Sequence, residues 1–169
     1  MQTVIRTREE TDLSECVAAL HAVHEFDGYP SSWPSDAIAW LTPQGLLQAW
    51  VARIGSSLAG HIAIGETDPV ESPHFVVLSA KSDKQLVEIK RLFVAPSFRA
   101  RGVGEALLEA ALSYAKAHAF HSVLEVTADR LAAIRLYERG GWRRIGTAPA
   151  GWRRASGERP LVHHYEAHE

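Results

Sequence analysis

Residues 88–104, EIKRLFVAPSFRARGVG, decide the fold of this chain. The first of them, 88–94, belong to a mostly apolar run, residues 86–94, which predicts a strand that ends before Pro96. Residues 102–118 then carry apolar side chains at helical spacing, which predicts a helix. The turn between the two, residues 99–104, contains two arginines and two glycines. A strand, a tight basic turn and a long helix are therefore expected in direct succession.

This turn has the chemistry of a phosphate-binding site. Glycines remove side chains, so a phosphate can approach the backbone closely. The first N–H groups of a helix have no acceptor within the helix, and the helix dipole adds partial positive charge there. Arg99 and Arg101 add full charges, so the turn suits a pyrophosphate. It lacks the Gly-Lys-Ser/Thr of a Walker loop and the third glycine of a dinucleotide fingerprint. A tight turn with solvated arginines is the alternative interpretation.

The remaining sequence alternates strand and helix signals, which predicts a mixed α/β sheet in one domain over residues 1–169. The other expected strands cover residues 3–6, 48–54, 58–64, 122–127, 142–147 and 161–165. The other expected helices cover residues 12–25 and 131–139, and a third begins after a cap at Ser35 or Asp36. Residues 66–84 read as a loop around an apolar patch at 75–78. That patch could form a strand, cover part of the core or meet a partner.

Composition narrows the classes of function. The 169 residues are 46% hydrophobic and 22% charged with a formal net charge of −2, which is typical of a globular protein and disfavours nucleic-acid binding. The single cysteine, Cys16, lies on the apolar face of its expected helix and is interpreted as a buried hydrophobe. The histidine spacing gives no metal pattern, so no metal is expected. No apolar run is long enough to span a bilayer and the N-terminal residues lack a secretory core, so a cytoplasmic protein without a membrane partner is expected.

Two motifs carry a family resemblance. Residues 88–96, followed by Arg99-x-x-Gly102-x-Gly104, resemble the main cofactor motif of the GNAT acetyltransferases. Ala133-x-x-x-Tyr137, continuing to Gly141-Trp142, resembles the second motif of that family. The resemblance is strong over residues 86–146 and faint over 66–84. It implies a single GNAT domain with a central sheet of about six or seven strands, about four flanking helices, and a V-shaped splay between the strands at 86–94 and 122–127.

The resemblance also implies acetyl-CoA as co-substrate. Its pyrophosphate would bind the backbone of residues 99–104, and its pantetheine arm would bind the backbone at Leu92 and Val94. An N–H near Phe93 or Val94 would then polarise the thioester carbonyl. The implied cofactor residues are Leu92, Phe93, Val94, Arg99, Ala100, Arg101, Gly102, Val103, Gly104, Arg130, Ala133 and Tyr137.

Two residues match the family positions that move protons. Glu88 aligns with a general base, and Tyr137 aligns with the tyrosine that protonates the departing sulfur. A solvated strand carboxylate and a core tyrosine are the respective alternatives, and Glu125 or a water chain could replace Glu88 as base. Arg130 stands where the family usually has asparagine, and it could reach a CoA phosphate or remain a solvated residue at a helix start.

The acceptor is left open by the sequence. Tyr29, Trp33 and Trp40 fall where the family places acceptor-site elements, and Glu125 is a further substrate candidate. The predicted activity is direct acetyl transfer to a primary amine of a small molecule, with a peptide or protein amine second. A non-catalytic acyl-CoA-binding module is the competing class. A monomer and a homodimer are equally compatible with the sequence.

Overall fold

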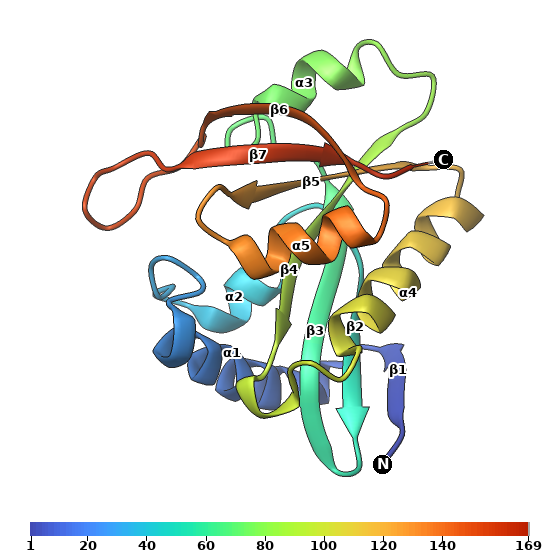
Figure 1. Cartoon of the computed structure of the whole chain (residues 1–169), viewed down its shortest axis with the longest axis vertical. Coiled ribbons are helices and arrows are strands. Elements are labelled where there is room, and N and C mark those ends of the chain that lie inside the picture. The colour runs from blue at the N-terminus through green and yellow to red at the C-terminus, as the bar shows by residue number, and fades with distance from the viewer. Residues whose placement is uncertain (169) are drawn as a thin grey trace. The chain divides into compact units, whose positions relative to one another are not determined.

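The computed structural model describes residues 1–168, which divide into two compact units. Unit 1 consists of residues 1–65 and 89–113, and unit 2 consists of residues 66–88 and 114–168. Each unit is therefore built from two separate stretches of the chain, whose elements are labelled in Figure 1.

Unit 1 contains the N-terminal strands, one complete long helix and the first part of another. Its elements are β1 (Thr3–Thr7), α1 (Leu13–Asp27), α2 (Ala37–Leu41), β2 (Leu46–Ile54), β3 (Ser57–Glu66), the C-terminal part of β4 (Leu86–Val94) and the first part of α4 (Val103–Ala117). Strand β2 pairs antiparallel with both β1 and β3, and the β2–β3 turn lies at Gly55 and Ser56. The predicted hairpin is confirmed.

Unit 2 contains the C-terminal strands. Its elements are the first residues of β4, α3 (His74–Ser79), the end of α4, β5 (His121–Thr127), α5 (Leu131–Arg139), β6 (Arg143–Pro149) and β7 (Leu161–Glu166). Strand β7 pairs antiparallel with β5 and with β6, whereas β4 and β5 are parallel. The predicted limits of α5 are confirmed to the residue.

Among residues 1–168, seven strands follow the order β1-β2-β3-β4-β5-β7-β6, with five α-helices. The predicted fold class, a mixed α/β sheet, is confirmed, and α3 is one helix more than expected. The β4–β5 ladder pairs Leu86 with His121, Val87 with Ser122, and Glu88 with Val123. The ladder ends at Glu88, the residue at which β4 passes from unit 2 into unit 1.

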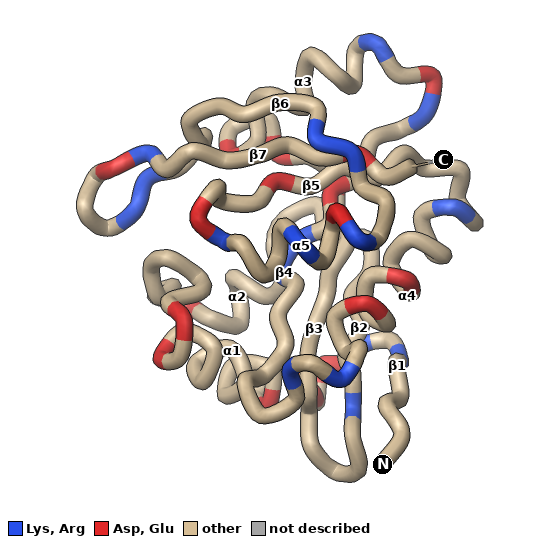
Figure 2. Tube along the Cα trace, in the orientation of Figure 1, with Lys and Arg blue, Asp and Glu red and all other residues tan. Residues whose placement is uncertain are grey.

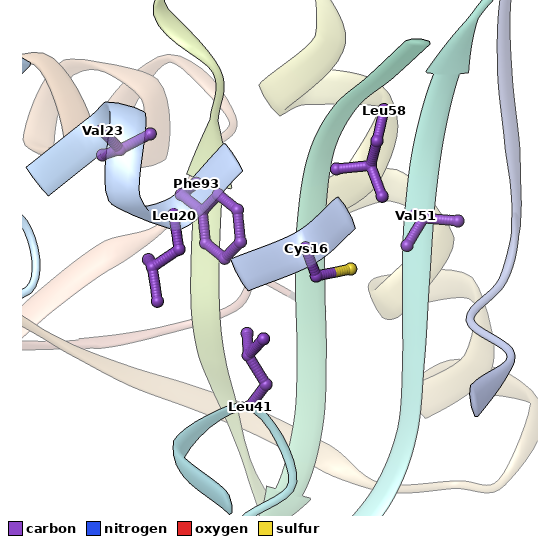
Figure 3. Packing of buried hydrophobic residues seen from close by; sticks show 7 residues of the cluster. All are labelled: Cys16, Leu20, Val23, Leu41, Val51, Leu58 and Phe93. Carbon is purple, nitrogen blue, oxygen red and sulfur yellow. The ribbon is translucent and has the colours of Figure 1, made fainter. Parts of the chain in front are cut away.

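The core of unit 1 lies between α1 and the strands. Figure 3 shows three side chains of α1, among them Cys16, placed over the strands that carry Val51, Leu58 and Phe93. All members of this cluster are at least nine-tenths buried. The apolar stripe that predicted α1 from the sequence is therefore the face that packs here, and burying each such side chain contributes about 1.5–3 kcal/mol.

In unit 2, the segment 66–84, predicted as a loop around an apolar patch, contains a helix. Residues 74–79 form helix α3, and fully buried Phe75 packs with Leu86 and Val123. A strand here was the wrong alternative, whereas a patch that covers part of the core was the right one. Val76 and Val77 are exposed, so the apolar run serves the core through Phe75 on one side of the helix.

Two aspartates that precede helices differ in whether they cap the helix. The Asp36 carboxylate accepts a hydrogen bond from the N–H of Ala39, which is the predicted cap of α2. Asp12 precedes α1, but its side chain does not cap that helix. It binds the guanidinium groups of Arg6 and Arg53 instead, at 2.7 and 3.1 Å. Within residues 1–168, no helix has the length and apolar character needed to cross a membrane.

Candidate functional site

The turn that opens α4 has a backbone that favours glycine. Ala100 and Gly102 have φ angles of 57° and 74°, in the left-handed region, and α4 begins at the next residue, Val103. A Cβ on Gly102 would meet nothing within 4 Å, so the backbone angle and not crowding is what requires glycine there. Left-handed residues beside a helix start direct N–H groups toward a common anion. The turn can therefore bind a pyrophosphate through its backbone.

The two arginines of the turn are held differently. The Nε of Arg99 donates to the carbonyl oxygen of Val94 at 3.1 Å, and its guanidinium forms a 2.7 Å ion pair with Asp27 at the end of α1. Arg101 is exposed and lies over the ring of Phe98. Figure 2 shows the basic residues of this turn and acidic residues along α1. Asp27 offsets part of the Arg99 charge, so Arg101 is the more available cation for a phosphate.

The last residues of β4 lead directly into this turn. Phe93 is buried in the core of unit 1, whereas Leu92 and Val94 are partly exposed. Gly60 of β3 faces the carbonyl oxygen of Phe93 so closely that a Cβ there would lie 2.8 Å from that oxygen. Glycine on β3 therefore permits a close approach of β3 to the strand expected to bind the pantetheine arm.

Unit 2 holds the two carboxylates singled out in the sequence. Glu88 is buried, and its Oε1 accepts a hydrogen bond from the buried Ser72 hydroxyl at 3.1 Å. The alternative of a solvated Glu88 is therefore wrong in this structure. Glu125 is nearly buried, and its Oε2 accepts a hydrogen bond from Nε2 of His164 at 3.0 Å. The His164 ring also stacks on the ring of His74, whose pKa is lowered because burial disfavours its charged form.

Sequence reasoning missed Ser72 and His164 as partners of these carboxylates. Ser72 lies in the segment that the sequence left unresolved. His164 had a usable signal, because neighbouring residues on a strand face opposite sides. The structure bears this out: His163 contacts the Thr147 hydroxyl, whereas His164 contacts Glu125.

Tyr137 lies on α5 and is buried, with its ring near those of Trp142 and Tyr165 at centroid distances of 6.1 and 6.3 Å. Tyr165 was not predicted as part of this group. Its hydroxyl donates to Glu138 at 2.8 Å and accepts from Arg144. A cluster of aromatic rings with polar ends therefore surrounds the candidate acid in unit 2.

The remaining candidate residues are placed as follows. Arg130 is the residue at the start of α5, and Ala133 is partly buried on its first turn. In unit 1, Tyr29 packs edge-on against Trp40, and Trp33 contacts the rings of His21 and His24. Aromatic rings thus gather along the segment between α1 and α2.

Cys16 is fully buried, and burial raises the pKa of its thiol to about 12. A thiol in this state is a poor nucleophile, which agrees with its interpretation as a core residue. Among residues 1–168, no group of three or more His, Cys, Asp or Glu side chains is arranged to hold a metal ion.

A strand that ends in a left-handed, arginine-bearing turn and opens a helix is an arrangement that α/β proteins use to bind phosphorylated ligands. Comparison with known proteins gives the family. The sequence profile of the acetyltransferase (GNAT) family matches residues 15–142. The chain belongs to this family, as its two motifs predicted.

Two relatives are similar to part of the chain. The chain is 32% identical to the N-alpha-acetyltransferase RimI of Mycobacterium tuberculosis over 98 residues, which is 56% of this chain and 51% of that protein. It is 35% identical to the N-acetylaspartate synthetase of Danio rerio over 72 residues, which is 42% of this chain and 26% of that protein. The chain thus spans about half or less of the length of the curated relatives that it matches.

A solved structure shares the fold over nearly the whole chain. Arabidopsis thaliana NAA60 in complex with acetyl-CoA superposes with a TM-score of 0.73 at 21% identity, covering 98% of this chain and 97% of that one. This likeness establishes the fold, and it is the fold of a protein crystallised with acetyl-CoA.

Proposed function

We propose that this protein is an N-acetyltransferase that moves an acetyl group from acetyl-CoA directly to a primary amine. The observation that carries the proposal is the turn 99–104, whose left-handed Ala100 and Gly102 immediately precede the start of α4. In this proposal its backbone N–H groups bind the pyrophosphate of CoA, with Arg101 beside them. Leu92 and Val94 bind the pantetheine arm through their backbone, and an N–H near Phe93 or Val94 polarises the thioester carbonyl.

The acceptor must lose a proton before it attacks. A primary amine with a pKa near 10 is mostly protonated at neutral pH, so a base is required. We assign this role to Glu88, because it matches the family position and because its carboxylate is buried and held by Ser72. Glu125, held by His164, and a chain of water molecules are the alternatives.

The transfer then needs an acid for the leaving group. The amine nitrogen attacks the thioester carbon, the C–N bond forms, and the C–S bond breaks to release the CoA thiolate. Tyr137 is proposed to give its phenolic proton to that sulfur. Arg130 and Ala133, at the start of the same helix, are proposed to contact the cofactor. Direct transfer is favoured over an acyl-enzyme because the thiol of Cys16 stays protonated and buried.

A small-molecule amine is the proposed acceptor, and a peptide N-terminus is the second candidate. The names of two relatives support acetylation of an amine: one is an N-alpha-acetyltransferase and the other is an N-acetylaspartate synthetase. Tyr29 and Trp33 are proposed to line the acceptor side.

The test is a thiol-release assay with acetyl-CoA and a panel of acceptors. Free amino acids, polyamines and aminoglycosides represent small molecules, and short peptides with free or blocked N-termini represent protein substrates. Amine-dependent CoA release supports the enzyme and ranks the acceptor classes. Slow CoA release that no amine stimulates identifies an acyl-CoA-binding module instead.

Variants test the roles of the two titratable residues. Glu88→Gln should lower the rate strongly at neutral pH and only slightly at alkaline pH, where the amine deprotonates unaided; exposed Glu109 provides the control Glu109→Gln. Tyr137→Phe should lower turnover more than acetyl-CoA affinity, with Tyr114→Phe on α4 as control. Unchanged rates would remove Glu88 or Tyr137 from the mechanism.

A further inference from the structure

Strand β4 contains a kink at Arg91 that the sequence does not predict. Arg91 has a φ angle of 56°, in the left-handed region, although it lies in the middle of a strand. This conformation brings Cβ close to the backbone, so a residue other than glycine keeps it only when its surroundings hold it there. The contacts of Arg91 therefore show what maintains the kink.

Three contacts hold Arg91, one at its backbone carbonyl and two at its guanidinium group. Its carbonyl oxygen lies 2.8 Å from Nδ1 of His61 on β3. Its Nε donates to the carbonyl oxygen of Trp40 at 2.9 Å, and its guanidinium lies 4.0 Å above the Trp40 ring. The main chain of the kink is thus held from β3, and its side chain is held from α2.

The protonation of His61 can be assigned from these partners. His61 is fully buried, and burial lowers its pKa to about 3, so the ring is neutral and carries a single N–H. A carbonyl oxygen can only accept, so this N–H is on Nδ1 and points at Arg91. Nε2 is then an acceptor, and it receives an N–H from the Arg8 guanidinium at 2.9 Å.

The hydrogen bonds therefore run in one direction, from Arg8 to His61 to the Arg91 carbonyl. A chain of this kind polarises each of its members and strengthens the bonds. Arg8 also donates to the carbonyl oxygen of Leu41 at 2.6 Å and to the Thr42 hydroxyl at 3.2 Å. Arg8 and Arg91 thus bind the carbonyl groups of Leu41 and Trp40, the last two residues of α2.

We infer that His61 and Arg8 are positioning residues for acetyl transfer. This inference rests on the proposed function, because the kink immediately precedes the residues proposed to bind the pantetheine arm and polarise the thioester. By holding the Arg91 carbonyl, His61 sets the directions of the N–H and C=O groups of Leu92 and Phe93. Arg8 holds His61 in the required tautomer and fixes the end of α2, the helix that follows the aromatic segment of the acceptor side.

A pair of substitutions at position 61 isolates the hydrogen bond. His61→Asn keeps a neutral N–H donor that can reach a carbonyl, whereas His61→Leu fills the site with an apolar side chain that cannot donate. We expect His61→Leu to lower kcat by about tenfold, the effect of losing one well-placed hydrogen bond, with a smaller change in the KM for acetyl-CoA. His61→Asn should recover most of the loss. Arg8→Met should resemble His61→Leu, and Arg8→Lys should lie between Arg8→Met and the unmodified protein.

The matched control is Ile62→Val, a change at the next buried residue of β3. Each variant is compared at equal fraction folded, measured by urea unfolding. A kcat for His61→Leu as high as that for Ile62→Val, or a failure of His61→Asn to exceed His61→Leu, would overturn the inference.

A second readout does not depend on activity. In NMR spectra of the ligand-free protein, the backbone amide signals of Leu92 and Phe93 should move in His61→Leu and return toward their original positions in His61→Asn. Unmoved signals in His61→Leu would overturn the inference even if the enzyme is active. Moved signals in a protein that neither binds acetyl-CoA nor acetylates any amine would refute the proposed function while leaving the role of His61 in the kink intact.

Discussion

Substitution of Gly60 tests how closely β3 and β4 approach each other. In Gly60→Ala, the new Cβ would lie 2.8 Å from the Phe93 carbonyl oxygen, 2.9 Å from Leu107 Cδ1 and 3.3 Å from Val103 Cγ1. The Leu107 methyl can rotate away, but the carbonyl belongs to the backbone of β4 and can move only with the strand.

Two effects of opposite sign set the magnitude. Overpacking of this kind costs about 1–3 kcal/mol in the free energy of unfolding. Replacing glycine by alanine restricts the unfolded chain and stabilises by about 0.4–1 kcal/mol. The net expectation is a loss of about 1–2 kcal/mol, or roughly 2–8 °C in Tm for a chain of this size. Because the displaced carbonyl belongs to Phe93, acetyl-CoA affinity should also fall.

Urea unfolding and calorimetric titration with acetyl-CoA measure the two quantities. Gly140→Ala is a control, because its φ is −77° and its closest contact would be 3.3 Å. The double variant Gly60→Ala with Leu107→Ala separates the contacts, since it relieves the methyl and leaves the carbonyl crowded. A Gly60→Ala protein that is as stable as the original and binds acetyl-CoA equally well would refute the reasoning.

The further predictions concern two buried groups of unit 1, Asp12 and Cys16. Asp12 has a pKa well below its usual value because Arg6 and Arg53 donate hydrogen bonds to its carboxylate. The ionised carboxylate therefore stabilises the folded state at pH values above about 4, the pKa of the group in the unfolded chain. Asp12→Asn should therefore cost about 2 kcal/mol at neutral pH, and urea titrations should show the gap closing as pH falls below about 4; a gap independent of pH would contradict this. Cys16, with its pKa raised to about 12, should resist iodoacetamide at pH 8 in the native protein and react fully in urea. Cys16→Ala should retain acetyl transfer, and loss of transfer in a folded Cys16→Ala protein would instead indicate an acyl-enzyme.

The parts of the fold that sequence predicted well are those in which local signals agree. Helix α5 was placed correctly because its helical residues meet Gly140 and Gly141 directly. The strand at 86–94 was clear because a mostly apolar run ends two residues before Pro96. Segment 66–84 was ambiguous because four apolar residues fit either a helix or a strand. The burial of Phe75 against Leu86 and Val123, which lie far from it in sequence, decides that helix.

The sequence predicted the residue types of the candidate site, but it did not predict the residues that hold its backbone in place. The glycines and arginines of the turn have a local chemical meaning, so the turn could be singled out. The kink at Arg91 could not be foreseen, because nothing about an arginine within a strand indicates a left-handed backbone. The single histidine within the apolar strand β3, His61, was the one available hint, and its significance depends on Arg8, which lies 53 residues earlier.

The division of the chain into interleaved segments has a consequence for synthesis on the ribosome. Residues 1–65 emerge first. Strand β4 follows β3 in the sheet order, but the residues of β4 that belong to unit 1, 89–94, emerge only later. Until then the nascent β2–β3 hairpin exposes an open edge of β3, with Gly60 uncovered, and such edges attract other strands. Unit 1 has all its residues once Ser113 has been added, whereas unit 2 still awaits β5, β6 and β7. The nascent chain therefore passes through a period in which protection by a chaperone would matter most.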